Sequence, residues 1–427
     1  MKNILEYILK VLAKIVLWRH KPEIVAVTGS VGKTGAKEAI YCALEKYLKV
    51  RRNIRNYNNE IGVPLTILGQ DISPRISIGG IFGWLRIFAK AVSTVLWQGD
   101  YPEILILEMG IRKPKDMDYL LDFVSVDVGV ITAIGEFPNH LEFFPEKEKL
   151  VKEKALLVKS LDKDGLAVLN YDDLSVRMIG DELPLELKII QYGFGEGANL
   201  QISNFDFSIS DLDKRDFGIS FKIEHEGNIV PFQLKGAAGK QHAFAVAIAA
   251  AVGLYFGLNL VEISSALKEH HSLPGRTNLI KGVKETWIID DSYNASPLAT
   301  LSALETLEQF SEGKRRKIAV LGDMLELGDK AEEGHRLVGE KAAEIVDLLF
   351  VVGTRAVFIA DQARKSGLAD DKIFEFQTPE EAGLAVQEKL VSQDIILIKG
   401  SRSIKMEEVV KEIMAHPEKA DQLLVEQ

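Results

Sequence analysis

The segment that most constrains the fold is a glycine-containing loop between a short apolar run and a helical pattern. Residues 24–27 are typical of a buried strand, and helical spacing begins at Lys37. The loop reads Gly-Ser-Val-Gly-Lys-Thr over 29–34, two residues shorter than the common G-x-x-x-x-G-K-T form. A strand, loop and helix in this order aim backbone N–H groups at an anion. We therefore predict a site for ATP or a close relative, in which Lys33 reaches the β- and γ-phosphates and Thr34 holds Mg²⁺.

Composition limits the class of protein and its partners. A length of 427 residues suggests about three domains, although two larger ones would also fit. The net charge of −10 argues against a nucleic-acid partner and leaves room only for a local basic groove. Cys42 is the only cysteine, which excludes an intrachain disulfide and fits a reducing cytosol. No apolar run is long enough to span a bilayer and no signal-peptide pattern is present, so we expect a cytoplasmic protein.

Two stretches, 4–18 and 76–97, have the pattern of amphipathic helices. In the first, Glu6, Lys10 and Lys14 fall on one stripe of an otherwise apolar helix. One interpretation is a helix that lies on an anionic membrane. The other, which we prefer, is a helix that docks its apolar face on the neighbouring domain. Two such stretches in one chain still favour a membrane-surface or partner contact.

Two polar residues follow expected strands in the first half of the chain. Glu108 ends the buried-strand pattern of 103–108, and His140 follows the strand pattern of 126–131. A carboxylate at the carboxyl end of a strand, in a chain with a phosphate loop, is a common way to hold Mg²⁺. His140 is either a plain loop residue or a metal or phosphate contact, and its place on the same side as the loop favours the second.

The remainder of the chain suggests two α/β units. The pattern of 146–159 predicts a helix with several lysines, none singled out by its own sequence, and 170–233 predicts edge hairpins that include 187–191. After a break at 273–277, strand patterns at 286–289, 317–321, 348–352 and 394–398 alternate with helices, which predicts a second doubly wound unit. Three loops after these strands, 290–297, 322–328 and 399–402, should face the nucleotide or a second substrate.

The expected fold is therefore α/β. It comprises a short N-terminal amphipathic helix (1–22), a central phosphate-loop ATPase domain with a parallel sheet (23–272) and a Rossmann-like C-terminal domain (273–427).

Several strings together resemble the Mur ligase family of peptidoglycan synthesis. They occur in the family's order and cover about residues 24–410. The strings NNEIGVPLT, DDSYNA and GDMLELG are most similar to the members that add D-alanyl-D-alanine. The full set is TGxxGKT from Thr28, NNEIGVPLT from Asn58, EMG from Glu108, HLE from His140, PGR from Pro274, DDSYNASP from Asp290, LGDMLELG from Leu321 and KGSR from Lys399.

The resemblance implies a reaction and a set of site residues. ATP would phosphorylate the terminal carboxylate of a UDP-muramoyl peptide, and the amine of D-alanyl-D-alanine would attack the acyl phosphate. Two Mg²⁺ ions are implied, one on Thr34 and Glu108 and one on His140 with a carbamylated lysine, which we align with Lys154. Arg276 would touch phosphate from the linker. The implied nucleotide contacts are Thr28, Gly29, Ser30, Val31, Gly32, Lys33, Thr34, Asp291 and Asn294, and the implied catalytic residues are Lys33, Lys154, His140 and Arg276.

The chain also departs from the family pattern. Val31 stands where the family has Asn, Gly35-Ala36 where Ser or Thr is common, and Ala243 and Val246 where an Asn-rich adenine contact is expected. Two extra residues lie between Ile134 and His140. Only about two dozen residues precede the loop, with no counterpart of the family's UDP-sugar-binding domain.

These departures lead to one further expectation and leave two alternatives. The stretches 4–18 and 76–97 would pack together near the active-site mouth, as a platform for the muramoyl portion or a contact with the inner membrane surface. The alternatives are a related ligase acting on another acidic peptide or polymer, and a nucleotide-binding protein without ligase chemistry. Lys154, Glu108 and His140 favour the ligase, and the sequence gives no indication of oligomeric state.

Overall fold

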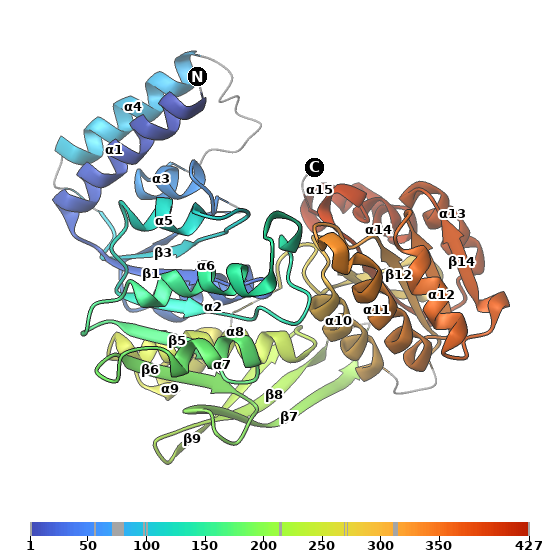
Figure 1. Cartoon of the computed structure of the whole chain (residues 1–427). Coiled ribbons are helices and arrows are strands. Elements are labelled where there is room, and N and C mark those ends of the chain that lie inside the picture. The colour runs from blue at the N-terminus through green and yellow to red at the C-terminus, as the bar shows by residue number, and fades with distance from the viewer. Residues whose placement is uncertain are drawn as a thin grey trace.

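The computed structural model describes residues 2–54, 57–70, 81–96, 99, 101–212, 216–268, 270, 272–310 and 315–425. For residues 2, 3, 81–86 and 96 it describes the backbone and not the side chains. Two α/β units lie side by side (Figure 1). The α/β class expected from the sequence is confirmed, with the phosphate loop in the first unit and a Rossmann-like sheet in the second. Among the described residues, no helix is both long and apolar enough to cross a bilayer.

The first sheet contains nine strands of the described chain, in the order β2-β3-β1-β4-β5-β6-β7-β8-β9. Strands β2 to β6 pair in parallel and β7, β8 and β9 form an antiparallel meander. The bounds are β1 Glu23–Thr28, β2 Val50–Arg52, β3 Ile104–Glu108, β4 Val128–Ile131, β5 Leu166–Asn170, β6 Lys188–Gly193, β7 Leu200–Asp211, β8 Asp216–His225 and β9 Asn228–Lys235.

Helices cover both faces of this sheet, because the central strands are apolar on both faces. Along β1, Val25 and Val27 pack toward α2 and α8, whereas Ile24 and Ala26 belong to the core on the opposite face. The first helical layer comprises α2 Lys33–Leu44, α8 Lys240–Tyr255 and α9 Leu260–Leu267, and the second comprises α1 Lys2–His20, α3 Gly62–Ile67, α4 Ile81–Leu96, α5 Asp116–Leu121, α6 Lys147–Lys159 and α7 Leu174–Asp181.

The second sheet contains six strands within the described part of the chain, in the order β10-β11-β15-β12-β13-β14. Only β10 runs antiparallel to its neighbour. The strands are β10 Asn278–Lys281, β11 Trp287–Asp291, β12 Lys317–Gly322, β13 Leu348–Val352, β14 Ile373–Phe376 and β15 Ile395–Lys399. The helices are α10 Pro297–Gln309, α11 Ala331–Ile345 and α12 Val357–Lys365 on one face, α13 Pro379–Lys389 and α14 Glu407–Ile413 on the other, and the short α15 Ala420–Leu423.

One local prediction is wrong. The run 187–191, expected in an edge hairpin, is strand β6 and pairs in parallel with β5. The physical reason is helix α7, which the sequence reading missed and which provides the crossover that parallel strands require. The antiparallel part of 170–233 is β7 to β9. The boundary at 273–277 falls between the last strand of the first sheet and the first strand of the second, and the domain limits themselves stay a prediction.

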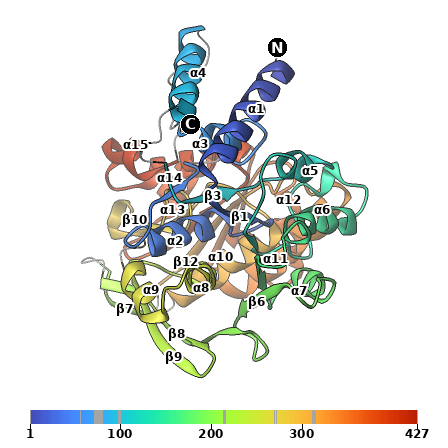
Figure 2. The same ribbon diagram turned by 90° about the vertical axis from the view of Figure 1, so that its left-hand side faces the viewer.

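The two amphipathic stretches are the helices α1 and α4, which project together from the first unit (Figures 1 and 2). Residues 76–80 and 97 of the second stretch lie outside the described residues. Helix α1 buries Leu9, Ala13 and Val16 completely in the core shared with α3. At its end, the His20 ring bonds through Nε2 to the Thr94 carbonyl at 2.8 Å, which ties α1 to α4.

The docked face of α1 leads to a stability prediction. Replacing Leu9, which is fully buried, with Ala should lower the free energy of unfolding by about 2–4 kcal/mol, because it leaves a cavity against α3. Replacing its neighbour Ile8, which is 37% exposed, should cost less than about 1 kcal/mol. Urea unfolding of the two variants measures both values. Equal losses would contradict the docking of α1 through its Leu9 face.

Candidate active site

A cavity of about 860 Å³ lies where the carboxyl ends of strands from both sheets meet. From the first unit it is lined by the phosphate loop, the residues after β3 and the start of α8. From the second it is lined by the residues after β11 and the end of β15. Contributing segments include Ser30–Gly35, Asn58–Glu60, Gly110–Lys113, Asn139–His140, Gln241–His242, Gly275–Thr277 and Asp291–Ser296, together with Glu108 and Lys399. No described residue of α1 or α4 is part of this lining.

The phosphate loop is held by the chain that follows β4. Gly29 has a φ of 141°, and a Cβ at this position would lie 2.0 Å from Thr132 Oγ1, so the approach requires glycine. The N–H groups of Ser30 and Val31 both donate to the Ala133 carbonyl, at 2.6 and 3.1 Å. These two amides are therefore occupied. The groups available to an anion are the amides at the start of α2 and the Ser30 hydroxyl.

Glu108 places a buried carboxylate next to the start of α2. The Thr34 hydroxyl donates to Glu108 Oε2 at 2.9 Å, and the Asn58 amide donates to Oε1 at 2.9 Å. Asn53, fully buried, accepts the Glu108 N–H through its side-chain oxygen at 2.9 Å. Both donors to the carboxylate are neutral groups, and Glu108 is only 2% exposed. This environment suits a cation bound by oxygen ligands.

Two lysines converge on a single backbone oxygen behind the loop. Lys33 Nζ and Lys154 Nζ each donate to the Gly29 carbonyl at 2.9 Å, and Lys33 also reaches the Ser30 carbonyl at 3.3 Å. Burial, reinforced by the charge of Lys33, holds the pKa of Lys154 well below its ordinary value. Burial likewise lowers the pKa of Lys33, which Glu108 partly offsets. The same environment disfavours the charged form of the Lys154 amine.

His140 joins the two units. Its Nδ1 donates to Glu326, which lies in the loop after β12, and Glu326 also accepts from Arg112 Nη2 at 2.9 Å. The hydrogen bond from His140 lowers the pKa of Glu326, whereas burial lowers that of His140. When a histidine donates one ring nitrogen to a carboxylate, its orientation is fixed and the other nitrogen can serve as a ligand. A metal role for His140 would therefore belong to Nε2.

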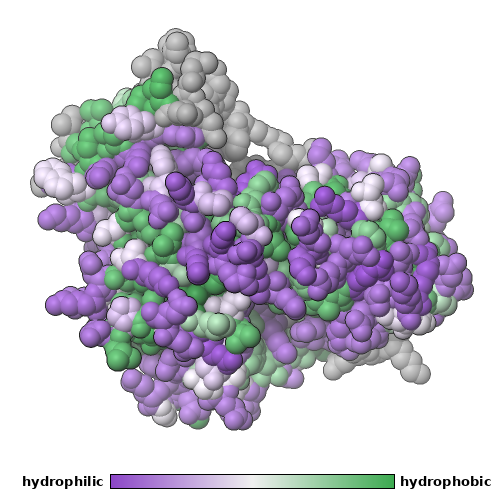
Figure 3. All heavy atoms as spheres, in the orientation of Figure 1, coloured by the Kyte–Doolittle hydropathy of each residue, from purple (hydrophilic) through white to green (hydrophobic). Residues whose placement is uncertain are grey.

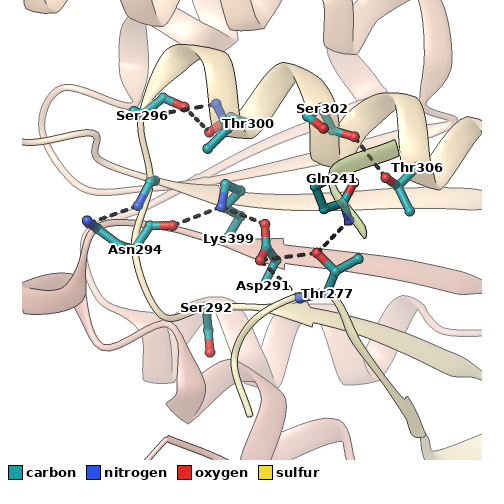
Figure 4. A network of polar contacts seen from close by, with 12 residues as sticks. Gln241, Thr277, Asp291, Ser292, Asn294, Ser296, Thr300, Ser302, Thr306 and Lys399 are labelled. Atoms are coloured by element: carbon teal, nitrogen blue, oxygen red, sulfur yellow. Dashed lines mark hydrogen bonds and ion pairs between the residues drawn. The ribbon is translucent and has the colours of Figure 1, made fainter. Parts of the chain in front are cut away.

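The linker between the units is fixed by a polar network (Figure 4). Asp291 accepts from the Thr277 N–H at 3.0 Å and from Lys399 at 2.6 Å, and Lys399 also donates to the Asn294 carbonyl at 2.8 Å. Gln241 extends the network by donating to Thr277 Oγ1 at 3.0 Å. Both carboxylate oxygens of Asp291 are thus engaged within the protein, and this network positions the linker and the Asn294 loop.

Three polar atoms in the lining are buried without a hydrogen-bond partner among the described residues. They are Ser30 Oγ, Asn139 Oδ1 and Gln241 Oε1. An unsatisfied buried polar atom is costly, so three of them around one cavity indicate a polar ligand. His242 lies beside Gln241, with its Nε2 3.2 Å from the Ser272 hydroxyl, and burial lowers its pKa to about 3, so its ring is neutral.

The cavity contains most of the residues that the sequence singled out. Lining residues from that set are Ser30, Val31, Gly32, Lys33, Thr34, Glu108, His140, Arg276, Asp291 and Asn294. Thr28, Gly29 and Lys154 lie behind the lining and support the loop, Thr28 through a hydrogen bond from its hydroxyl to the Met109 carbonyl at 2.9 Å. Arg276 packs over the Tyr293 ring, 4.2 Å from its centroid.

Other site residues were missed by sequence reasoning. Asn58 stood in a recognised string without a role, although an amide in a polar turn near a phosphate loop is a signal. Glu326 and Asn139 also stood in or beside recognised strings, and Gln241 stands two residues before Ala243, where an adenine contact was expected. In the described part of the chain, no group of three His, Cys, Asp or Glu residues is arranged to hold a metal. A Mg²⁺ ion here would have to complete its shell with Thr34, water and phosphate oxygens, as this ion commonly does.

Comparison with known proteins gives a consistent result. Residues 93–253 match the Mur ligase middle domain, and residues 275–402 match the domain described as Mur ligase, glutamate ligase domain. The UDP-N-acetylmuramoyl-tripeptide–D-alanyl-D-alanine ligase of Bacillus subtilis is 30% identical over 414 residues, which cover 96% of this chain and 79% of that protein. The enzyme of the same name from Escherichia coli is 26% identical over 91% of this chain and 76% of its own length.

Solved structures agree on the fold. MurF from Acinetobacter baumannii superposes with a TM-score of 0.76 at 23% identity, covering 95% of this chain and 79% of its own. MurF ligase from Thermotoga maritima, solved in complex with ADP, gives a TM-score of 0.75 at 24% identity, covering 98% of this chain and 84% of its own.

The bridge through Glu326 leads to a prediction about closure of the two units. Replacing Glu326 with Ala removes the bonds to Arg112 and His140, each worth up to about 1 kcal/mol in such partly exposed pairs. Tryptic cleavage after Arg276 in the linker should therefore become roughly three- to tenfold faster. Glu333→Ala is the matched control, because Glu333 pairs with Lys330 inside the second unit. Equal cleavage rates for the two variants and the wild type would contradict the bridge.

Proposed function

This chain belongs to the Mur ligase family, and on that premise we propose that it is an ATP-dependent ligase that attaches D-alanyl-D-alanine to UDP-N-acetylmuramoyl-tripeptide. The observation that carries the proposal is one cavity in which Lys33, Thr34 and Glu108 of the first unit face Arg276 of the linker and Asn294 of the second unit. The substrates are those in the names of the relatives, and the ADP complex of a relative of the same fold supports ATP as the nucleotide.

The reaction consists of two substitutions. A carboxylate oxygen of the tripeptide attacks the γ-phosphorus of ATP, an O–P bond forms and ADP leaves. The amine nitrogen of D-alanyl-D-alanine then attacks the acyl carbon, phosphate leaves with the oxygen it gained, and the nitrogen loses a proton. Phosphoryl transfer of this kind depends on positioning and charge neutralisation.

The residues of the cavity suit those two requirements. Lys33 bonds the carbonyls of Gly29 and Ser30 in its own loop, and it can exchange them for the oxygens of a phosphate bound at the start of α2. Arg276 approaches from the linker and lies near enough to Lys33 to lower its pKa, so the two cations address one anionic region. Closure of the two units around the cavity excludes water, which would otherwise hydrolyse the acyl phosphate.

Mg²⁺ is the expected metal, held by Thr34 and Glu108, with a second ion proposed on His140 and a modified Lys154. The contact between the Thr34 hydroxyl and the Glu108 carboxylate supports this, since both offer the oxygen ligands that Mg²⁺ prefers. Bound Mg²⁺ supplies neutralisation of the phosphate charge. Glu326 fixes the His140 ring in the orientation described above.

Carbamylation of Lys154 would remove the repulsion between the two lysine side chains that share the Gly29 carbonyl. The neutral Nζ attacks the carbon of CO₂, an N–C bond forms, one oxygen becomes anionic and a proton leaves. The product replaces a buried cation next to Lys33 with an anion, which is electrostatically favourable there. The lowered pKa of Lys154, caused by burial, provides the amine that this step needs.

The proposed location is the cytoplasm, beside the inner face of the membrane. The single buried cysteine fits a reducing cytoplasm. The apolar outer face of α1 supports a place beside the membrane.

The function is tested by phosphate release from ATP. Release should require both UDP-N-acetylmuramoyl-tripeptide and D-alanyl-D-alanine, and Lys33→Ala should lower kcat/KM by about 100- to 1,000-fold because transition-state charge loses a donor. Lys152→Ala, an exposed helix lysine, is the control and should retain activity. Release that ignores both substrates would favour a nucleotide switch instead. Release supported by another acidic peptide would favour the related ligase.

The Lys154 modification is tested separately. Lys154→Ala should lose at least about 100-fold in kcat, with partial rescue by high chloride or another small anion. Supplying ¹³CO₂ should add a carbamate carbon signal to the wild type and to Lys152→Ala, and none to Lys154→Ala. A wild-type enzyme without that signal would exclude carbamylation while leaving the ligase proposal to its own test.

A further inference from the structure

Helix α1 has a second apolar stripe, opposite the one that it buries. Six large apolar side chains on this stripe are exposed, and three of them, Ile4, Tyr7 and Trp18, are 66%, 68% and 75% exposed. At 100° per residue the six fall within an arc of about 100°, centred away from Leu9 and Val16. The outer stripe consists of Ile4, Tyr7, Ile8, Val11, Ile15 and Trp18. Figure 3 shows hydrophobic surface over the upper part of the first unit, where α1 and α4 lie.

Basic residues border the outer stripe on both sides. Lys14 lies at one edge of the arc and Arg19 at the other, and Lys21 follows the helix end; all three are exposed. The acidic residue of the helix, Glu6, lies outside the arc and is partly buried. The chain as a whole carries a net charge of −10, so this concentration of positive charge is local. A surface that covers the stripe should therefore be apolar at its centre and anionic at its edges.

Two occupants have suitable shape, and charge decides between them. The spacing 4, 8, 11, 15, 18 alternates four and three residues, which would suit the seam of a coiled coil with a second copy. In a parallel pair, however, Lys14 would face Arg19 of the second copy. In an antiparallel pair neither residue would meet an acidic side chain, because the one acidic residue of the helix, Glu6, lies off the seam. An anionic bilayer offers the opposite charge. Trp18 and Tyr7 are residue types that concentrate at the membrane–water interface.

We propose that the outer stripe of α1 docks the protein on an anionic phospholipid bilayer. The apolar side chains enter the headgroup region while Lys14, Arg19 and Lys21 contact lipid phosphates. The contact is peripheral, since α1 remains packed on α3 and α4 through Leu9 and His20. It does not depend on the proposed ligase activity, because no described residue of α1 lines the cavity.

Vesicle flotation of the full chain tests this docking. Vesicles of phosphatidylcholine alone are compared with vesicles that contain phosphatidylglycerol, at low and high salt. Val11→Gln/Ile15→Gln removes apolar contacts, and Lys14→Gln/Arg19→Gln removes charge. The matched control is Val261→Gln/Val391→Gln, which changes two exposed apolar residues elsewhere. Urea unfolding of each variant establishes that the fold is retained.

The expected result is binding to the anionic vesicles alone, weakened by salt. Each α1 double variant should lower the partition coefficient by at least about tenfold, and the control should leave it within twofold. No binding by the wild type, or equal binding by wild type and α1 variants, would overturn the proposal. The proposal would also be overturned if the wild type does not bind vesicles and sedimentation shows it to be a dimer that Val11→Gln/Ile15→Gln disrupts. That result would identify a second copy as the occupant of the outer stripe.

Discussion

The Gly29 carbonyl and the glycine that carries it fix the geometry of the whole site. The backbone at Gly29 is pressed against Thr132, which sets the position of the phosphate loop relative to β4. Its carbonyl then accepts from Lys33 of the loop and from Lys154 of α6. One backbone oxygen thus orders two cations from distant parts of the chain. Their mutual repulsion in a buried place can be relieved by an anion, whether a phosphate in front or a modification of Lys154 behind.

A second constraint acts across the two units. The ion pair of Asp291 with Lys399 is largely buried, with side chains 14% and 3% exposed, and together with Thr277 and Gln241 it determines how the linker leaves the first unit. The Glu326 bridge acts at the other side of the cavity, where it holds His140 and Arg112. The cavity combines three unsatisfied polar atoms, on Ser30, Asn139 and Gln241, with the cations of Lys33 and Arg276. A polar ligand that carries phosphates matches that set of groups.

The sequence predicted the parts of this arrangement that depend on local pattern. The strand before the loop, the carboxylate at the end of β3 and the alternation after 277 all follow from the periodicity of neighbouring residues. It could not predict contacts between distant segments. Glu326 lies 186 residues from His140, and nothing in either segment alone sets their distance. The same holds for the Ser30 and Val31 amides, whose partner Ala133 depends on how β4 sits beside β1. The error at β6 arose because a short β-branched run does not itself determine strand direction.

The central claim is that this cavity transfers the γ-phosphoryl group of ATP to a carboxylate before an amide forms. The most direct measurement labels the terminal carboxylate of UDP-N-acetylmuramoyl-tripeptide with ¹⁸O and follows the label by mass spectrometry. The account predicts that each amide bond formed sends one ¹⁸O atom into inorganic phosphate, because the acyl phosphate breaks between that oxygen and the acyl carbon. Amide formation that leaves the phosphate unlabelled would contradict it.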